Sequence, residues 1–129
     1  MIVIDSSVWV SHFANVLHDE VLRLRSIERA YEIIVGDVVL MEVLRGARSD
    51  RDAQAIESRL SLFDFHPMLD RQIATIASRN YRMLRSRGIT IRSSIDLIVG
   101  TYCIENGHQL LQRDRDYLAM HQHLGLMLY

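Results

Sequence analysis

The sequence contains no lysine, so all 15 of its basic residues are arginines. This absence excludes a phosphoacceptor receiver domain, which also has an acidic pocket but needs a lysine to hold its acyl phosphate. Composition alone leaves two explanations of the arginines open. One is a GC-rich genome that encodes basic residues as arginine. The other is contact with phosphates and bases, which guanidinium groups match well.

Cysteine and long apolar runs are also scarce. Cys103 is the only cysteine, which excludes an internal disulfide and fits a reducing, cytoplasmic location. No apolar run reaches the roughly 18 residues that span a bilayer, and no basic segment precedes the first apolar residues. We therefore expect neither a membrane anchor nor a secretory signal. The net charge of −1 does not by itself indicate a nucleic-acid partner.

The remaining composition is that of a soluble globular protein, and the 129 residues fit one domain, residues 1–129. Short apolar runs alternate with helical spacings along the whole chain. The expected strands are 2–5, 33–35, 62–66, 109–112 and 126–128. The expected helices are 17–29, 38–46 with Asp37 as its cap, 50–61, 70–86, 95–105 with Asn106-Gly107 as its end, and 114–122.

This alternation predicts an α/β fold with a short parallel sheet of four to five strands and helices on both faces. In such sheets, ligands bind beyond the carboxyl ends of the strands, where the strand order reverses. We therefore expect the functional residues at that edge.

Four acids stand next to sequence that should be buried. Asp5 closes the run Ile2-Val3-Ile4, and Glu42 shares a helical face with apolar residues. Asp96 precedes Leu97-Ile98-Val99, and Asp114 follows Leu110-Leu111. A buried carboxylate is costly unless it is paired, hydrogen-bonded or bound to a metal. Four of them in one small domain predict an acidic pocket that binds divalent cations.

Each acid also has a purely structural interpretation, which the sequence leaves open. Asp5 could be a turn residue at the end of a strand, and Asp96 or Asp114 could cap a helix. Glu42 could turn to solvent beside Arg45. The metal interpretation favours hard ions such as Mg²⁺ or Mn²⁺, which prefer carboxylate oxygen.

The other candidate metal ligands fit a zinc site poorly. The histidines His108, His121 and His123 lack a zinc-binding spacing and are expected at the surface. Cys103 lies in an apolar helical stretch and is expected in the core.

The chain resembles the PIN-domain ribonucleases, and among them the VapC-type toxins of toxin–antitoxin pairs. The resemblance covers essentially the whole chain. It rests on the order and spacing of four segments: Ile2 to Trp9, Leu40 to Gly46, Asp96 to Val99, and Leu110 to Tyr117. Gln112 and Tyr117 depart from the family, whose members often have Thr or Ser and Phe at these places.

The resemblance implies a PIN-like three-layer fold and assigns Asp5, Glu42, Asp96 and Asp114 as the metal-binding catalytic quartet. Ser7 matches the polar residue that supports the quartet. It also implies Mg²⁺, with Mn²⁺ as a substitute, and hydrolysis of RNA to products with a 5′-phosphate and a 3′-hydroxyl. Two metals roughly 4 Å apart could share this chemistry.

The resemblance further implies a homodimer, a cognate VapB-type antitoxin, and transfer RNA or ribosomal RNA as substrate. Trp9, Phe13 and Leu17 offer a possible dimer contact, although Trp9 and Phe13 could equally pack in the core. Two alternatives stay open: a PIN nuclease of ordinary RNA processing, and a catalytically inactive PIN binding module.

Several residues near the quartet are further candidates. Arg92, Arg113 and Arg115 flank the acids and are candidates for binding RNA phosphates, with a solvated surface as the alternative. Asp116 is a candidate supporting residue, with a surface helix acid as the alternative.

Overall fold

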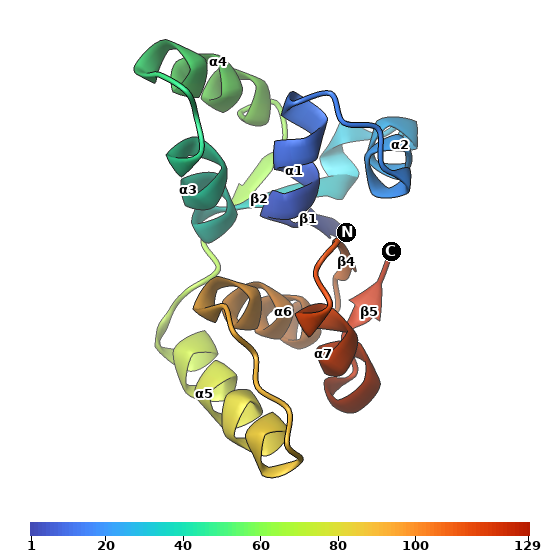
Figure 1. Ribbon diagram of the computed structural model, residues 1–129, viewed down its shortest axis with the longest axis vertical. Helices are drawn as coiled ribbons and strands as arrows, with labels where there is room; N and C mark the ends of the chain where they lie inside the picture. The colour runs from blue at the N-terminus through green and yellow to red at the C-terminus, as the bar shows by residue number, and fades with distance from the viewer.

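A computed structural model describes residues 1–129 and shows a parallel sheet between two layers of helices (Figure 1). The five strands run parallel in the order β3-β2-β1-β4-β5. Their bounds are β1 Ile2–Ile4, β2 Ile33–Gly36, β3 Asp64–His66, β4 Gln109–Leu111 and β5 Met127–Leu128. The predicted α/β fold with a parallel sheet of four to five strands is confirmed.

The helices form two groups, one on each face of the sheet. The group α1–α4 covers one face and the group α5–α7 covers the other (Figure 1). Their bounds are α1 Ser6–Phe13, α2 Asp19–Ser26, α3 Asp37–Arg45, α4 Asp50–Leu60, α5 Arg71–Ser86, α6 Ser94–Asn106 and α7 Asp116–Leu124, with a short 3-10 helix at Ala30–Glu32. None of the helices is both long and apolar enough to cross a membrane.

The apolar strands explain where the core lies. Every residue of β1 and β2 is buried, because helices cover both faces of these central strands. Gly36 and Gly100 also contribute to this core, because each leaves space for a methionine side chain. A Cβ on Gly36 would lie 2.3 Å from the sulfur of Met68, and one on Gly100 would lie 2.5 Å from the sulfur of Met120. A side chain at either position would have to displace the methionine side chain that now fills the space.

Several predicted boundaries need correction. The predicted strand 62–66 begins only at Asp64, because residues 61 and 62 are still in the turn that follows α4. The predicted helix 17–29 is shorter, Asp19–Ser26. The end of α6 is as predicted, since Gly107 takes the left-handed conformation with φ of 65°.

Asp37 was predicted to cap α3, and this prediction is wrong. Gly36 is the N-cap, and Asp37 is the first residue of the helix. Its Oδ1 accepts from the backbone N–H of Val38 at 2.8 Å and from that of Met68 at 2.9 Å. Asp37 therefore joins the start of α3 to the segment that follows β3.

The strand order reverses at the centre of the sheet. From β1 the chain moves through β2 to β3 in one direction, whereas β4 and β5 lie on the other side of β1. The order thus reverses between β1 and β4, whose carboxyl ends are at Ile4 and Leu111. Asp5 and the segment with Asp114 follow directly, which is the predicted location of the functional residues.

Candidate active site

Asp5 is held by three hydrogen bonds at the end of β1. Its carboxylate is only 2% exposed, and its Oδ2 accepts from both the backbone N–H and the hydroxyl of Ser7. Its Oδ1 accepts from the hydroxyl of Tyr117 at 2.8 Å. These donors stabilise a charge that would otherwise be costly to bury. The role predicted for Ser7, support of an acid, agrees with this geometry.

Tyr117 was not singled out as a functional residue from the sequence. It lies fully buried in α7, and its hydroxyl reaches a residue 112 positions away along the chain. Burial, followed by the charges of Asp5 and Asp96, raises the pKa of Tyr117 well above its ordinary value. The phenol is therefore protonated and donates to Asp5.

Glu42 lies on α3 and points inward, as its place among Val39 and Val43 predicts. Its side chain is 16% exposed, and its Oε2 accepts from the hydroxyl of Ser6 at 2.7 Å. Arg45 also reaches Glu42, at 3.4 Å, but it is 71% exposed and contributes little. Ser6 was missed in the sequence because only its neighbour matched the family pattern.

Asp96 lies in the first turn of α6, where the N-cap Ser93 accepts its backbone N–H at 3.2 Å. The side chain is 7% exposed. Burial, followed by the charges of Asp5, Asp114 and Glu42, raises the pKa of Asp96 from 3.8 to about 7. The charges of the other three acids of the predicted quartet therefore all act on the pKa of Asp96.

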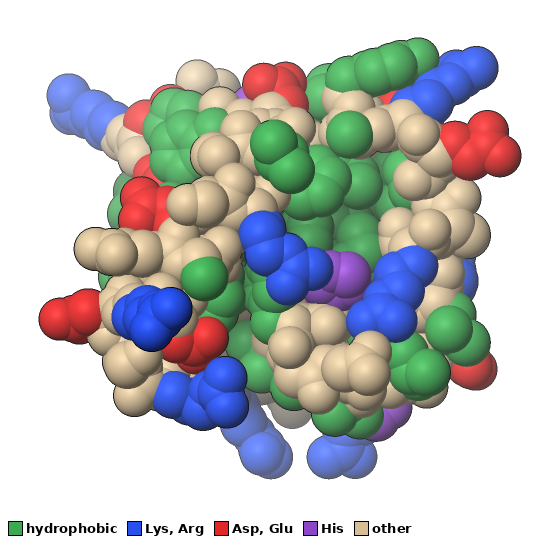
Figure 2. Space-filling model, turned by 90° about the horizontal axis from the view of Figure 1, so that it is seen from above, with side chains coloured by type: hydrophobic (Ala, Val, Ile, Leu, Met, Phe, Trp, Pro, Cys, Tyr) green, Lys and Arg blue, Asp and Glu red, His purple; other side chains and the backbone are tan.

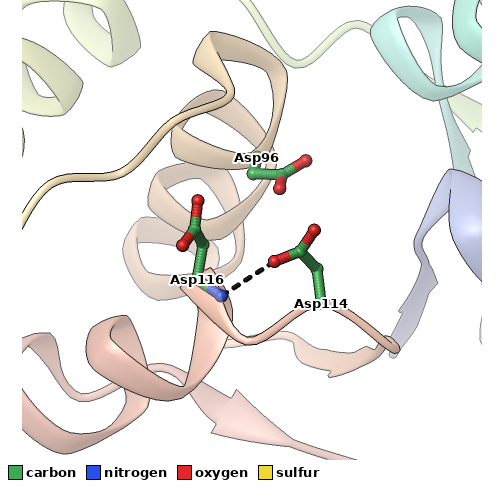
Figure 3. A group of neighbouring side chains, drawn as sticks. All are labelled: Asp96, Asp114 and Asp116. Carbon is green, nitrogen blue, oxygen red and sulfur yellow. Dashed lines mark hydrogen bonds between the residues drawn. The ribbon is translucent and has the colours of Figure 1, made fainter.

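Asp114 and Asp116 complete the acidic group between β4 and α7. The Oδ1 of Asp114 accepts the backbone N–H of Asp116 at 2.9 Å, and the Oδ2 of Asp116 accepts the backbone N–H of Arg92 at 2.9 Å. One carboxylate oxygen each of Asp96, Asp114 and Asp116 lie within 4.8 Å of one another (Figure 3). Asp114 does not cap α7, whose N-cap is Arg115.

The three arginines near the site differ in their contacts. Arg113 bonds Glu20 at 3.3 Å and the hydroxyl of Ser11 at 3.3 Å, so it ties the segment after β4 to α1 and α2. Arg92 and Arg115 are exposed and form no ion pair. These two remain better placed than Arg113 to meet a phosphate.

The remaining sequence candidates lie away from the acids. Cys103 is fully buried in α6, and burial raises the pKa of its thiol, which fits the predicted core role. His121 bonds the carbonyl of Leu126 and His123 faces Arg87, so the histidines share no metal site. Trp9 is 1% exposed and belongs to the core, so it cannot form a dimer contact.

The donor set fits a hard divalent cation. Carboxylate oxygens of Asp96, Asp114 and Asp116 lie within 4.8 Å of one another, and the charges of Asp5 and Glu42 contribute, after burial, to the raised pKa of Asp96. A cation would relieve this repulsion, and Mg²⁺ and Mn²⁺ prefer oxygen ligands of this kind.

Comparisons with known proteins agree with this geometry. A family model described as the PIN domain matches residues 2–121. "Ribonuclease VapC11" of Mycobacterium tuberculosis (strain H37Rv) is 32% identical over 120 residues, covering 91% of this chain and 89% of that protein. "VapC ribonuclease Mb1587" of Mycobacterium bovis shows the same identity and coverage.

Solved structures share the fold at low identity. FitAB bound to a DNA fragment superposes with a TM-score of 0.79 at 16% identity, covering 100% of this chain and 94% of that one. DNA-bound VapBC from Salmonella typhimurium gives 0.76 at 16% identity, with 99% and 96% covered. A toxin–antitoxin complex from Klebsiella pneumoniae gives 0.69 at 16% identity, with 91% and 90% covered.

Proposed function

Because the chain belongs to the PIN domain family, and within it to the VapC ribonucleases, we propose that it is a metal-dependent endoribonuclease and the toxin of a toxin–antitoxin pair. The observation that carries the proposal is the acidic group. Carboxylate oxygens of Asp96, Asp114 and Asp116 lie within 4.8 Å of one another. The charges of Asp5 and Glu42 contribute to the raised pKa of Asp96.

The residues of the site divide the work of phosphodiester hydrolysis. Asp96, Asp114 and Asp116 would hold Mg²⁺ or Mn²⁺ together with Asp5 and Glu42, whose charges both raise the pKa of Asp96. The metal, when bound, would polarise the scissile phosphate and lower the pKa of a water molecule. Ser7 holds Asp5, and Ser6 holds Glu42, each through its hydroxyl. The exposed guanidinium groups of Arg92 and Arg115 would orient the phosphates of the RNA.

RNA cleavage by the purified protein tests the enzymatic part. We expect EDTA to stop cleavage of transfer RNA or ribosomal RNA, and Mg²⁺ or Mn²⁺ to restore it. A well-folded Asp96→Asn protein should not cleave under any of these conditions. Equal cleavage with EDTA and with Mg²⁺ would contradict the metal-dependent mechanism.

The partner of the toxin would be a VapB-type antitoxin, as in the toxin–antitoxin complexes that share the fold. A groove of about 450 Å³ between α1, α3 and α4 offers a place for it. Val10, Phe13, Val43 and Ile56 line the groove, and Arg48 and Arg59 stand at its wall. Figure 2 shows this end of the molecule, with a hollow of apolar side chains and arginines around it.

The position of the groove suggests how an antitoxin would inhibit. Val43 lines the groove and follows Glu42 on α3, but none of the five acids of the site lines the groove itself. A basic side chain of the antitoxin would have to extend beyond the groove to the acids to compete with the metal. A homodimer is also part of the proposal, and since Trp9 is buried, exposed residues such as Val10 or Leu17 would have to supply any contact from α1 and the segment after it.

Growth assays separate the toxin from a nuclease of ordinary RNA processing. Expression of the chain alone should arrest growth, and co-expression with an adjacent small gene should restore it. The purified partner should inhibit cleavage at near-stoichiometric amounts. Harmless expression in several hosts, together with a monomeric active protein that no neighbouring gene product binds, would favour the processing nuclease.

A further inference from the structure

The hydroxyl of Tyr117 leaves Asp5 very little freedom as a ligand. A carboxylate has about four lone-pair positions, two on each oxygen. Ser7 occupies both positions of Oδ2 with its backbone N–H and its hydroxyl, and Tyr117 occupies one position of Oδ1. One lone pair on Oδ1 is therefore left for any further partner. That lone pair lies in the plane of the carboxylate, whose orientation is fixed by Ser7 at Oδ2 and by Tyr117 at Oδ1.

The ring of Tyr117 is held by packing that does not depend on its hydroxyl. It packs between α6 and α7, and a Cβ on Gly100 would lie 3.6 Å from the Cδ1 atom of the ring. The space left by this glycine admits the end of Met120, whose sulfur would lie 2.5 Å from that Cβ, whereas the ring of Tyr117 is at an ordinary contact distance. The packing of the ring therefore does not require the hydroxyl. A buried hydroxyl is costly without a partner, and here its partner is Asp5.

We propose that Tyr117 is a positioning residue, which directs the one remaining lone pair of Asp5 into the acidic site and thereby sets the affinity for the divalent cation. The inference rests on the proposed metal-dependent function. It gives a specific role to a position at which the chain carries a hydroxyl that phenylalanine would lack. Residues that hold a metal ligand in place typically affect metal affinity or activity about 10- to 100-fold.

The test compares Tyr117→Phe with Tyr102→Phe. Tyr102 also donates its hydroxyl to a side chain, or accepts from it, at 2.8 Å, but that partner is His66 and lies away from the acids. Mg²⁺ binding is measured by titration calorimetry without RNA, and the melting temperature is recorded with and without Mg²⁺. We expect about 10-fold weaker Mg²⁺ binding in Tyr117→Phe, and an unchanged affinity in Tyr102→Phe.

The pattern of losses separates positioning from packing. If Tyr117 positions Asp5, the stabilisation by Mg²⁺ shrinks and the Mg²⁺ concentration for half-maximal cleavage rises about 10-fold, with a smaller loss of kcat at saturating Mg²⁺. If the hydroxyl only supports the fold, the melting temperature falls equally with and without Mg²⁺, and the affinity stays within twofold of wild type. That second result overturns the inference.

A measurement on the wild type keeps the inference testable if Tyr117→Phe does not fold. Binding of Mg²⁺ to Asp5 changes the charge next to the phenol, so the near-ultraviolet absorption of tyrosine should shift as Mg²⁺ is added. The shift should persist in Tyr102→Phe. A wild type that binds Mg²⁺ without any shift contradicts the inference alone, whereas a wild type that neither binds Mg²⁺ nor cleaves RNA contradicts the proposed function.

Discussion

The two sides of the acidic site treat their carboxylates differently. On the side of β1 and α3, side-chain hydroxyls bind the acids: Ser7 and Tyr117 hold Asp5, and Ser6 holds Glu42. We call this the hydroxyl side.

On the side of α6 and α7, Asp96, Asp114 and Asp116 face one another. We call this the open side. Asp114 and Asp116 receive only single backbone N–H bonds, and the pKa of Asp96 is raised to about 7.

This difference indicates that hydrogen bonds stabilise the acids of the hydroxyl side, whereas a bound cation would stabilise the acids of the open side. The charges of the hydroxyl side are already hydrogen-bonded in the absence of a ligand, although Asp5 keeps one lone pair on Oδ1 for a cation. On the open side, burial and then the neighbouring carboxylates raise the pKa of Asp96, so this side gains most from a cation. Functional sites often contain such a destabilised part, because the stability lost in the free protein is recovered when the ligand binds. The comparison predicts that the same substitution has opposite effects on stability in the two places.

The largest effect should be on catalysis, and it should be shared by both sides. Asp5→Asn on the hydroxyl side and Asp96→Asn on the open side each remove a charged ligand with almost no change of shape. We expect RNA cleavage to fall more than about 100-fold in both, beyond the effect of residues that only orient a ligand. Single-turnover cleavage at saturating Mg²⁺ is the measurement. Near-wild-type cleavage by either variant would show that its side is not part of the metal site.

The next effect is on stability, and it should have opposite signs. Asp96→Asn removes a repelled charge and should raise the metal-free melting temperature by about 3–6 °C. Asp5→Asn places an amide against three donors and should lower the free energy of unfolding by about 1–3 kcal/mol. Thermal and urea denaturation with EDTA measure both. A fall in stability for both variants would remove the distinction between the two sides.

The pH dependence sharpens the same comparison. The pKa of Asp96 is raised from its ordinary value of 3.8 to about 7, so between these values the folded chain keeps a proton that the unfolded chain has lost. Metal-free stability should therefore fall as the pH rises through this range, and the fall should be smaller in Asp96→Asn. Stabilisation by Mg²⁺ should increase as the pH rises past 7, because the metal needs the deprotonated carboxylate. Urea denaturation at several pH values, with and without Mg²⁺, gives both slopes.

The smallest effect should come from Ser6→Ala, which removes one neutral donor from Glu42. A single hydrogen bond of about 0.5–1.5 kcal/mol corresponds to a loss of roughly two- to tenfold in kcat/KM. Ser26→Ala is a matched control, since the hydroxyl of Ser26 bonds only a carbonyl on an exposed helix. Equal activity of the two variants would mean that Glu42 does not need its hydroxyl partner.

The sequence predicted the framework well because the framework depends on local patterns. Short apolar runs and helical spacing locate the central strands and most helices, and the acids at strand ends follow from the parallel topology. Asp37 shows where this reasoning stops. Its bond to the N–H of Met68 joins residues 31 positions apart, and no local pattern indicates such a bridge.

The site shows the same limit. Adjacent serines at the start of α1 look equivalent in the sequence, yet Ser6 serves Glu42 and Ser7 serves Asp5. Tyr117 looks like an ordinary core aromatic, and only the tertiary structure brings its hydroxyl to Asp5. Asp116 looks like a surface helix acid, but the turn that its N–H makes with Asp114 carries it into the site.

The position of β1 between β2 and β4 has a consequence for the time course of folding. Ile2 pairs with Ile33 on one side and with Gln109 on the other, so the centre of the sheet closes only when segments far apart in sequence meet. Such non-local contacts form slowly compared with helices. Asp5 and Tyr117 meet across this closure, 112 positions apart. We therefore expect a newly made molecule to form the hydrogen bond between Tyr117 and Asp5, and with it the acidic site, only once the centre of the sheet has closed.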